Sequence, residues 1–133
     1  MEEHGRYGVG NEGRGYKSKA EVHIARMLEN SGIAYNYEHP LAVVDGGRVR
    51  IWYPDFYLPE YGMIIEYFDV NGDTSYDERK QHKLEAYRQA GIEGVFLTND
   101  SLKGDWPTKL LSQIEDVLKG RIKRFYNRRY ADV

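Results

Sequence analysis

Residues Tyr53–Phe68, with the sequence YPDFYLPEYGMIIEYF, decide the fold that this chain predicts. Two runs rich in aromatic and β-branched residues flank Pro59-Glu-Tyr-Gly62, a turn sequence that ends in glycine, so the segment is typical of a β-hairpin. A turn centred on this sequence places Asp55 directly opposite Glu66 on one face of the hairpin. The opposed residues of the other face are wholly apolar, namely Phe56 with Ile65 and Leu58 with Met63.

The two facing carboxylates require a partner. Directly opposed residues of antiparallel strands have Cβ atoms about 4.5–5.5 Å apart, and like charges at this spacing destabilise a sheet. Two carboxylates placed in this way become tolerable when they share a proton or bind a cation. We therefore interpret Asp55 and Glu66 as ligands of a metal site, which the rest of the chain is expected to serve.

Length and composition indicate one globular domain. The 133 residues are 41% hydrophobic and 30% charged, which is ordinary for a chain that can bury a sizeable core. The absence of cysteine excludes disulfides and thiolate metal sites. The sequence shows no signal peptide and no apolar run of the roughly 18 residues that a membrane span needs. We therefore expect a cytoplasmic protein without membrane contact.

Basic residues gather near the two ends of the chain, although the formal net charge is −2. Residues 1–17 are rich in glycine and predict a flexible basic arm, either a remnant of expression or an arm that orders on nucleic acid. Residues 18–119 are expected to form the single domain, and residues 120–133 a basic, aromatic tail. Such a distribution is typical of a protein whose terminal segments bind the phosphates of a nucleic acid.

The first predicted helix covers residues 18–31 and stops at Gly32. Ser18-Lys-Ala-Glu21 has the pattern of a capping box, which by itself explains Glu21. However, Glu21 also begins the i, i+3, i+4, i+7 stripe that continues through Ile24, Ala25 and Leu28 and faces the core. A carboxylate on a buried stripe needs a partner, so we favour a metal ligand over a cap.

The remaining elements predict an α/β fold. Residues 33–41 alternate like a strand, Asp45-Gly-Gly47 is a hairpin turn, and a strand from Arg48 continues into the Asp55 hairpin. Residues 33–68 are thus expected to form a three-stranded antiparallel meander. A helix capped by Asp73, Thr74 or Ser75 runs to Ala90, the strand Glu93–Thr98 then joins in parallel, and a third helix starts at Asp105 and is interrupted by Gly120.

The second helix carries a lysine on its apolar face. Lys80, Lys83, Leu84 and Tyr87 share one face by helical geometry, and Arg79, Lys83 and Tyr87 form an i, i+4, i+8 row. A purely structural helix would have leucine at position 83. Lysine can also extend its ammonium group out of such a stripe into solvent, so a structural interpretation stays open.

In this order, the elements and acidic residues resemble the PD-(D/E)xK nuclease superfamily over about residues 16–100. The matching segments look like members with a Vsr-like core and like nuclease modules of helicases: Ser18–Glu21, Tyr35–Glu38, Tyr53–Pro59 and Ile65–Phe68. The glycine-rich start and Asp77–His82 are also similar to the phage endonucleases I that resolve Holliday junctions. The resemblance implies a restriction-endonuclease-like core, in which helices flank a mixed four-stranded sheet made of an antiparallel meander and one crossover strand.

The resemblance also implies a metal centre. Asp55 and Glu66 would bind the ion, Glu21 would complete the acidic cluster, and the backbone carbonyl of Tyr67 would add another oxygen. Hard oxygen ligands of this kind suit Mg²⁺ or Mn²⁺. The ion would bind the scissile phosphate and lower the pKa of an attacking water.

The chain departs from the family at one catalytic position. The family lysine two residues after the second carboxylate is Phe68 here. Related members recruit a side chain from the next helix, and Lys83 is the candidate, with Lys80 and Arg79 as alternatives. The residues expected to contact nucleic acid are Arg14, Lys17, Lys19, Arg79, Lys80, Tyr87, Lys123, Arg124, Arg128 and Arg129.

The predicted function is therefore that of a metal-dependent DNA endonuclease in repair or recombination, which nicks DNA or resolves Holliday junctions. The chain has room for one active site, so cleavage of both strands requires a homodimer. A helicase or another repair or recombination protein is a further expected partner. The alternative is a catalytically inactive nuclease fold that binds DNA or proteins, which Phe68 favours and the opposed carboxylates disfavour.

Overall fold

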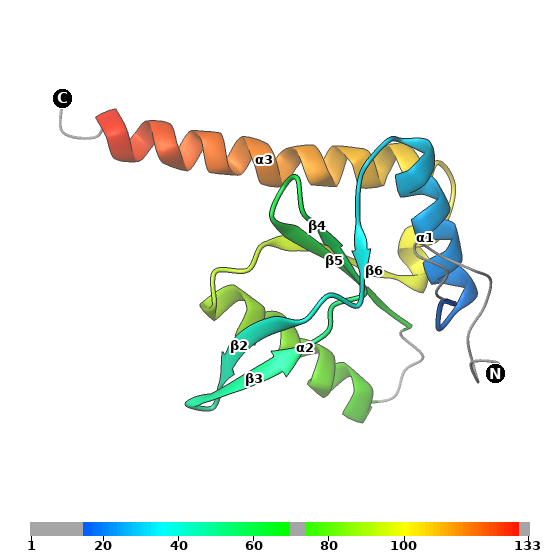
Figure 1. The fold of residues 1–133 in the computed structure, drawn as a ribbon, viewed down its shortest axis with the longest axis horizontal. Helices are drawn as coiled ribbons and strands as arrows, with labels where there is room; N and C mark the ends of the chain where they lie inside the picture. Colours follow the sequence, from blue (N-terminus) through cyan, green and yellow to red (C-terminus); the bar gives the residue numbers. More distant parts are fainter. Residues whose placement is uncertain (1–14, 70–73, 131–133) are drawn as a thin grey trace.

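The computed structural model describes residues 15–69 and 74–130, which form a sheet covered by helices on both faces (Figure 1). The elements in chain order are α1 (Lys19–Asn30), β1 (Asn36–Tyr37), β2 (Leu41–Asp45), β3 (Arg48–Trp52), β4 (Phe56–Leu58), β5 (Met63–Phe68), α2 (Thr74–Gln89), β6 (Gly94–Thr98), the 3₁₀ helix η2 (Asn99–Leu102) and α3 (Trp106–Tyr130). The main sheet is mixed and four-stranded, with the strand order β1-β4-β5-β6. The α/β class and the mixed four-stranded sheet are thus confirmed.

The predicted hairpin is present in the predicted register. Phe56 pairs with Ile65 and Leu58 with Met63, so β4 and β5 are antiparallel. The turn closes through the Gly62 N–H, which donates to the Leu58 carbonyl at 2.8 Å, and Gly62 has a φ of +60° that glycine adopts without strain. β5 also pairs in parallel with β6 after the crossover through α2, as the sequence predicted.

The predicted three-stranded antiparallel meander is present as β1, β4 and β5, but its middle strand does not start at Arg48, because a separate ribbon is inserted between β1 and β4. Only Asn36–Tyr37 of residues 33–41 pairs with the main sheet, as β1, whereas β2 and β3 form a separate two-stranded ribbon. The chain leaves β1 at Glu38, whose φ of +56° is incompatible with an extended strand, and Pro40 lacks a backbone donor. Pro54 likewise separates β3 from β4. The ribbon packs instead on α2, and its turn at Gly46 and Gly47, both with positive φ, is the predicted hairpin turn.

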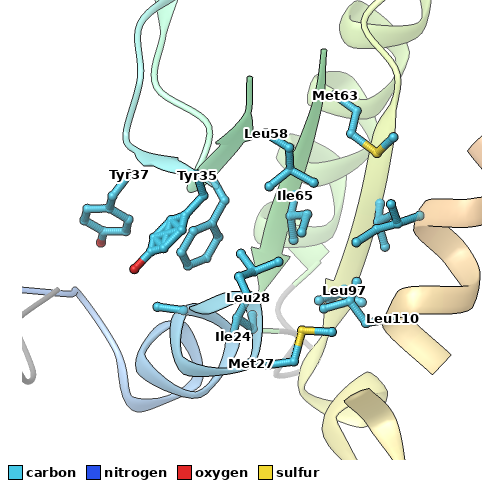
Figure 2. Packing of buried hydrophobic residues seen from close by; sticks show 14 of the residues in the cluster. Ile24, Met27, Leu28, Tyr35, Tyr37, Leu58, Met63, Ile65, Leu97 and Leu110 are labelled. Atoms are coloured by element: carbon cyan, nitrogen blue, oxygen red, sulfur yellow. The ribbon is translucent and has the colours of Figure 1, made fainter. Parts of the chain in front are cut away.

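The larger core lies between the main sheet and the helices α1 and α3. In Figure 2, Ile24 and Leu28 of α1 face the hairpin residues Leu58 and Ile65, and Met27, Leu97 and Leu110 extend the cluster toward α3. Tyr16 also belongs to this core and is 2% exposed. The folded part therefore begins before Ser18, and the predicted arm is shorter than residues 1–17; residues 1–14 lie outside the described part of the chain.

The smaller core lies on the opposite face of the sheet. It joins Ile64 of β5 to Ala86 and Tyr87 of α2 and to Val43 of the ribbon. Residues of β5 thus alternate between two covered faces, with Ile65 toward α1 and α3 and Ile64 toward α2. Glu66, two residues after Ile64, consequently faces α2, which is the element that carries Lys83.

Helix α3 continues through Gly120, where the sequence predicted an interruption. Glycine inside a helix costs only about 1 kcal/mol relative to alanine, and contacts of the residues that follow Gly120 offset this loss. Arg121 donates to the carbonyls of Tyr61 and Gly62, and both Arg121 and Arg124 pair with Glu93. The end of α3 projects beyond the sheet in Figure 1, and none of the helices within the described residues could cross a bilayer.

Candidate active site and metal centre

Asp55 and Glu66 hold one another through the backbone of the hairpin. The Asp55 N–H donates to Glu66 Oε1 at 2.9 Å, and the Tyr67 N–H donates to Asp55 Oδ2 at 2.7 Å. Asp55 is 5% and Glu66 2% exposed. The two carboxylates are therefore fixed in place by the strands themselves and are almost completely removed from bulk solvent.

The negative charge of Asp55 is only partly compensated by its surroundings. Burial raises the pKa of Asp55 well above its usual range, and the negative charges of Glu66 and then Glu21 raise it further. The Tyr67 N–H and the Lys17 ammonium oppose this shift without cancelling it. A divalent cation would supply the missing charge, so the donor set fits a hard metal ion.

The backbone of Tyr67 lies beside the same pair. The Ile64 N–H donates to the Glu93 carbonyl on the β6 side, so alternation along β5 turns the Tyr67 backbone toward the β4 side. The Tyr67 N–H indeed reaches Asp55 there. The structure thus brings Tyr67 next to the carboxylates, and the role of its carbonyl as a metal ligand stays a prediction.

Glu21 lines the same pocket, and its backbone takes part in the N-cap of α1. Its N–H donates to Ser18 Oγ at 3.2 Å, which caps α1, while its carboxylate Oε1 accepts from the Tyr37 hydroxyl at 2.5 Å and from the Lys17 N–H at 3.0 Å. The pocket has a volume of 360 Å³ and is lined by Lys17, Glu21, Asp55, Glu66, Tyr67, Phe68, Arg79, Lys80 and Lys83.

Glu21 does not form a complete metal cage with the other two carboxylates. Within residues 15–69 and 74–130, no three aspartate, glutamate, histidine or cysteine side chains gather closely enough to hold an ion by themselves. Mg²⁺ often uses only one or two protein carboxylates and takes its other oxygens from water and phosphate. The Asp55–Glu66 pair is sufficient for that mode, and Glu21 as a third ligand stays a prediction.

Lys83 reaches the site from α2, as the helix pattern suggested. Its Nζ lies 2.9 Å from Glu66 Oε2 and 6.0 Å from the centre of the Phe68 ring. The Nζ of Lys80 lies 5.5 Å from the same ring. The ammonium groups of two lysines thus lie over the Phe68 ring, and the attraction between a cation and an aromatic face stabilises this arrangement.

Tyr87 corrects one predicted nucleic-acid contact. The side chain is fully buried, and its hydroxyl donates to Glu66 Oε2 at 2.9 Å. Its position on the inward face of α2 places it against β5 and β6 rather than on the surface. Tyr87 therefore holds the Glu66 carboxylate by a hydrogen bond, and because it is buried it cannot contact DNA directly.

Lys17 is a site residue whose position the sequence did not reveal. Its Nζ lies 3.1 Å from Glu38 Oε2 and 3.6 Å from Asp55 Oδ1. Burial lowers the pKa of Lys17, but Asp55, Glu38 and Glu21 outweigh burial, so the net pKa is raised. The adjacent capping sequence was the available signal, because a cap at Ser18 fixes the path of residue 17.

The other predicted nucleic-acid contacts differ in where they lie. Arg124 is engaged with Glu93 at 2.5 Å, so part of its role is to anchor α3. Arg14 lies outside the described residues, and Arg79 and Lys80 line the carboxylate pocket. The exposed basic residues that remain are Lys19, Lys123, Arg128 and Arg129.

Comparisons with known proteins give matches to an ATP-binding import protein and to a nuclease. No family model matches the chain, and no solved structure matches it. The Fe(3+) ions import ATP-binding protein FbpC of Haemophilus influenzae (strain 86-028NP) is 27% identical over 119 residues, which cover 87% of this chain and 33% of FbpC. FbpC 2 of another H. influenzae strain is also 27% identical, with 32% of its length covered.

The nuclease match covers a larger share of the relative. Endodeoxyribonuclease 1 of Enterobacteria phage T3 is 32% identical over 95 residues, which make up 68% of this chain and 59% of the phage enzyme. The chain thus spans about one third of the FbpC proteins and less than two thirds of the nuclease. Over those 95 residues, this chain is similar to a phage endodeoxyribonuclease.

Proposed function

We propose that this protein is a metal-dependent DNA endonuclease of the PD-(D/E)xK type, which hydrolyses phosphodiester bonds. The observation that carries the proposal is the buried Asp55–Glu66 pair with Lys83 Nζ 2.9 Å from Glu66 Oε2. A binding module gains nothing from two buried, facing carboxylates, whereas a metal-dependent hydrolase uses them to hold its ion. The similarity to the phage endodeoxyribonuclease supports the same substrate.

The FbpC similarity does not lead to an equivalent proposal. P-loop proteins cradle phosphates with a G-x-x-x-x-G-K-[ST] stretch, and none occurs in these 133 residues. The carboxylate pocket offers acidic oxygens in place of a glycine-rich cradle. The nuclease proposal therefore uses the site that this chain has.

Mg²⁺ or Mn²⁺ would be held by Asp55, Glu66 and the Tyr67 carbonyl, with Glu21 behind them. When bound, the ion supplies positive charge to the phosphate and lowers the pKa of a water molecule. Tyr87 fixes the Glu66 carboxylate through its 2.9 Å hydrogen bond, and the Tyr67 N–H fixes Asp55 at 2.7 Å. These contacts hold the two carboxylates in one orientation before substrate arrives.

Lys83 would do the work of the missing family lysine. Hydrolysis joins a water oxygen to phosphorus while the bond to one sugar oxygen breaks, and negative charge builds on the phosphate oxygens. The Lys83 ammonium group, held between Glu66 and the Phe68 ring, can orient the water and stabilise that charge. Lys80 and Arg79, which line the same pocket, can neutralise the neighbouring phosphates.

A branched substrate and a homodimer belong to the same proposal. The described residues bring together one pair of facing carboxylates, so two symmetric cuts at a four-way junction would require two copies of the chain. A helicase or another recombination protein as a partner rests only on the family resemblance. Exposed basic residues on α3, among them Arg128 and Arg129, would bind phosphates of the DNA that lie outside the pocket.

The proposal is tested with supercoiled plasmid and a four-way junction, each with Mg²⁺, with Mn²⁺ or with EDTA. We expect nicking that requires the metal and that Asp55→Asn abolishes. Cleavage that persists in EDTA or in Asp55→Asn would contradict the metal site. Retained DNA binding without cleavage under every condition would favour the inactive module that Phe68 suggests.

A further inference from the structure

A second hollow adjoins the carboxylate pocket on the side of the β2–β3 ribbon. It has a volume of 480 Å³ and is lined by Trp52, Glu78, Arg79, His82 and Lys83. Arg79 and Lys83 line both this hollow and the carboxylate pocket, so the two lie next to each other. A polymer bound at the carboxylates can therefore extend into the second hollow.

Trp52 forms the aromatic wall of this hollow. The residue ends β3 and is partly exposed, and its ring meets Tyr87 edge-on with 5.3 Å between ring centres. Tyr87 in turn donates to Glu66 at 2.9 Å. One side chain thus separates the indole from the carboxylate pair, and packing on Tyr87 fixes the orientation of the indole.

The opposite wall is one face of α2 and is mainly cationic. Arg79 and Lys83 lie one helical turn apart, and His82 is bonded to Asp45 of the ribbon at 2.8 Å, which ties the two walls together. Glu78 adds one hydrogen-bond acceptor, the type of group that receives an exocyclic amino group of a base. Cations beside a flat aromatic side chain are the usual elements of single-strand DNA sites.

We propose that this hollow receives an unpaired nucleobase adjacent to the scissile phosphate, stacked on Trp52. The proposal rests on the proposed nuclease function, because the strand enters the hollow from the carboxylate pocket. A base inside a duplex is already stacked on both faces and cannot stack on an indole. The hollow therefore gives the enzyme a preference for DNA with unpaired bases next to the cleavage point, such as branches and flaps.

Trp52 fluorescence provides a direct test. Trp106→Phe leaves Trp52 as the single tryptophan, and Asp55→Asn in the same chain prevents cleavage and removes one repelling charge. Addition of a flap duplex should reduce the Trp52 emission and protect it from acrylamide, whereas a fully paired duplex of the same length should do neither. A Trp52→Phe chain, which reports only on Trp106, should respond to neither DNA.

Affinity gives a second, independent readout. Trp52→Ala should weaken binding of flap DNA about tenfold, and Trp52→Phe should retain most of the affinity, because stacking on an aromatic ring contributes roughly 1–3 kcal/mol per base. Ile51→Ala is the matched control, since Ile51 is the preceding residue of β3 and is 52% exposed. It should leave both binding and cleavage unchanged.

The outcomes separate this inference from the nuclease proposal. Unchanged Trp52 emission on a flap complex that a gel shift detects would overturn the base subsite, while plasmid nicking by the native chain would still stand. Equal responses to flap and fully paired DNA would also overturn it. Absence of any DNA binding by the native chain would overturn both proposals.

Discussion

Lys83 of α2 and Tyr87, one helical turn later, converge on a single oxygen of Glu66. The Lys83 Nζ and the Tyr87 hydroxyl each lie 2.9 Å from Glu66 Oε2. Residues at i and i+4 share one face of a helix, so this convergence follows directly from the packing of α2 on β5. Helix α2 therefore completes a site whose carboxylates come from the hairpin.

Lys83→Ala should reduce the rate of plasmid nicking by about 100-fold or more at saturating metal, because one preorganised charge is lost from the transition state. Lys80→Ala is the matched control: Lys80 lies over the same Phe68 ring at 5.5 Å and borders the same pocket. We expect a smaller loss from Lys80→Ala. Single-turnover rates of both variants measure the difference, and full activity of Lys83→Ala would remove this lysine from the mechanism.

The raised pKa of Asp55 predicts how stability depends on pH without metal. A carboxyl whose pKa is higher in the folded than in the unfolded chain binds its proton more tightly when folded. Its contribution to stability is fully present below the unfolded pKa of about 3.9 and is lost as pH rises through the raised folded pKa. The metal-free protein should therefore lose stability over that window.

Thermal unfolding in EDTA tests this expectation. Asp55→Asn removes the titrating group, so at neutral pH its Tm should exceed that of the native chain, with roughly 4 °C for each kcal/mol in a domain of this size. Mg²⁺ should raise the Tm of the native chain and have little effect on Asp55→Asn. A lower Tm of Asp55→Asn at neutral pH, together with an unchanged pH profile, would contradict the raised pKa.

The local features of this site could be predicted from the sequence, because short-range rules determine them. Turn chemistry and strand alternation together fix the hairpin register, and with it Asp55 opposite Glu66. Helical periodicity likewise places Lys83 on the inward face of α2. In each case the deciding residues are close in sequence, so no knowledge of distant contacts is required.

The features that could not be predicted depend on contacts between distant residues. Glycine lowers helix propensity, so Gly120 suggested an interruption, but the bonds of Arg121 to Tyr61, Gly62 and Glu93 help to keep α3 continuous. The ribbon leaves the main sheet at Glu38, whose φ of +56° was not predicted by the alternating pattern of residues 33–41. Lys17 near Asp55 is a third case, since its place depends on where α1 docks.

Glu21→Gln separates the capping role of Glu21 from a role in metal binding. Glutamine keeps an oxygen that can accept from the Tyr37 hydroxyl and the Lys17 N–H, and the backbone N–H of residue 21 still donates to Ser18 Oγ, which caps α1. If Glu21 supports the ion, Mn²⁺ affinity measured by calorimetry should fall about 10- to 100-fold. Unchanged Mn²⁺ affinity with a lowered Tm would assign Glu21 to structure alone.

The exposed basic residues near the end of α3 should set the salt dependence of DNA binding. Replacement of Lys123, Arg128 and Arg129 by alanine should weaken binding and flatten the plot of log K against log salt by about 0.9 for each phosphate contact that is lost. Binding isotherms at several salt concentrations measure the slope.

The control for this experiment is an exposed basic residue at the other end of the same helix. Lys109→Ala removes one positive charge near the start of α3 and should leave the slope unchanged. Arg121 and Arg124 are unsuitable, because both are bonded to Glu93 and their loss would loosen α3 itself. A slope that stays the same in the triple variant would show that DNA does not reach the end of α3, and the phosphate contacts would then have to come from the residues around the carboxylate pocket.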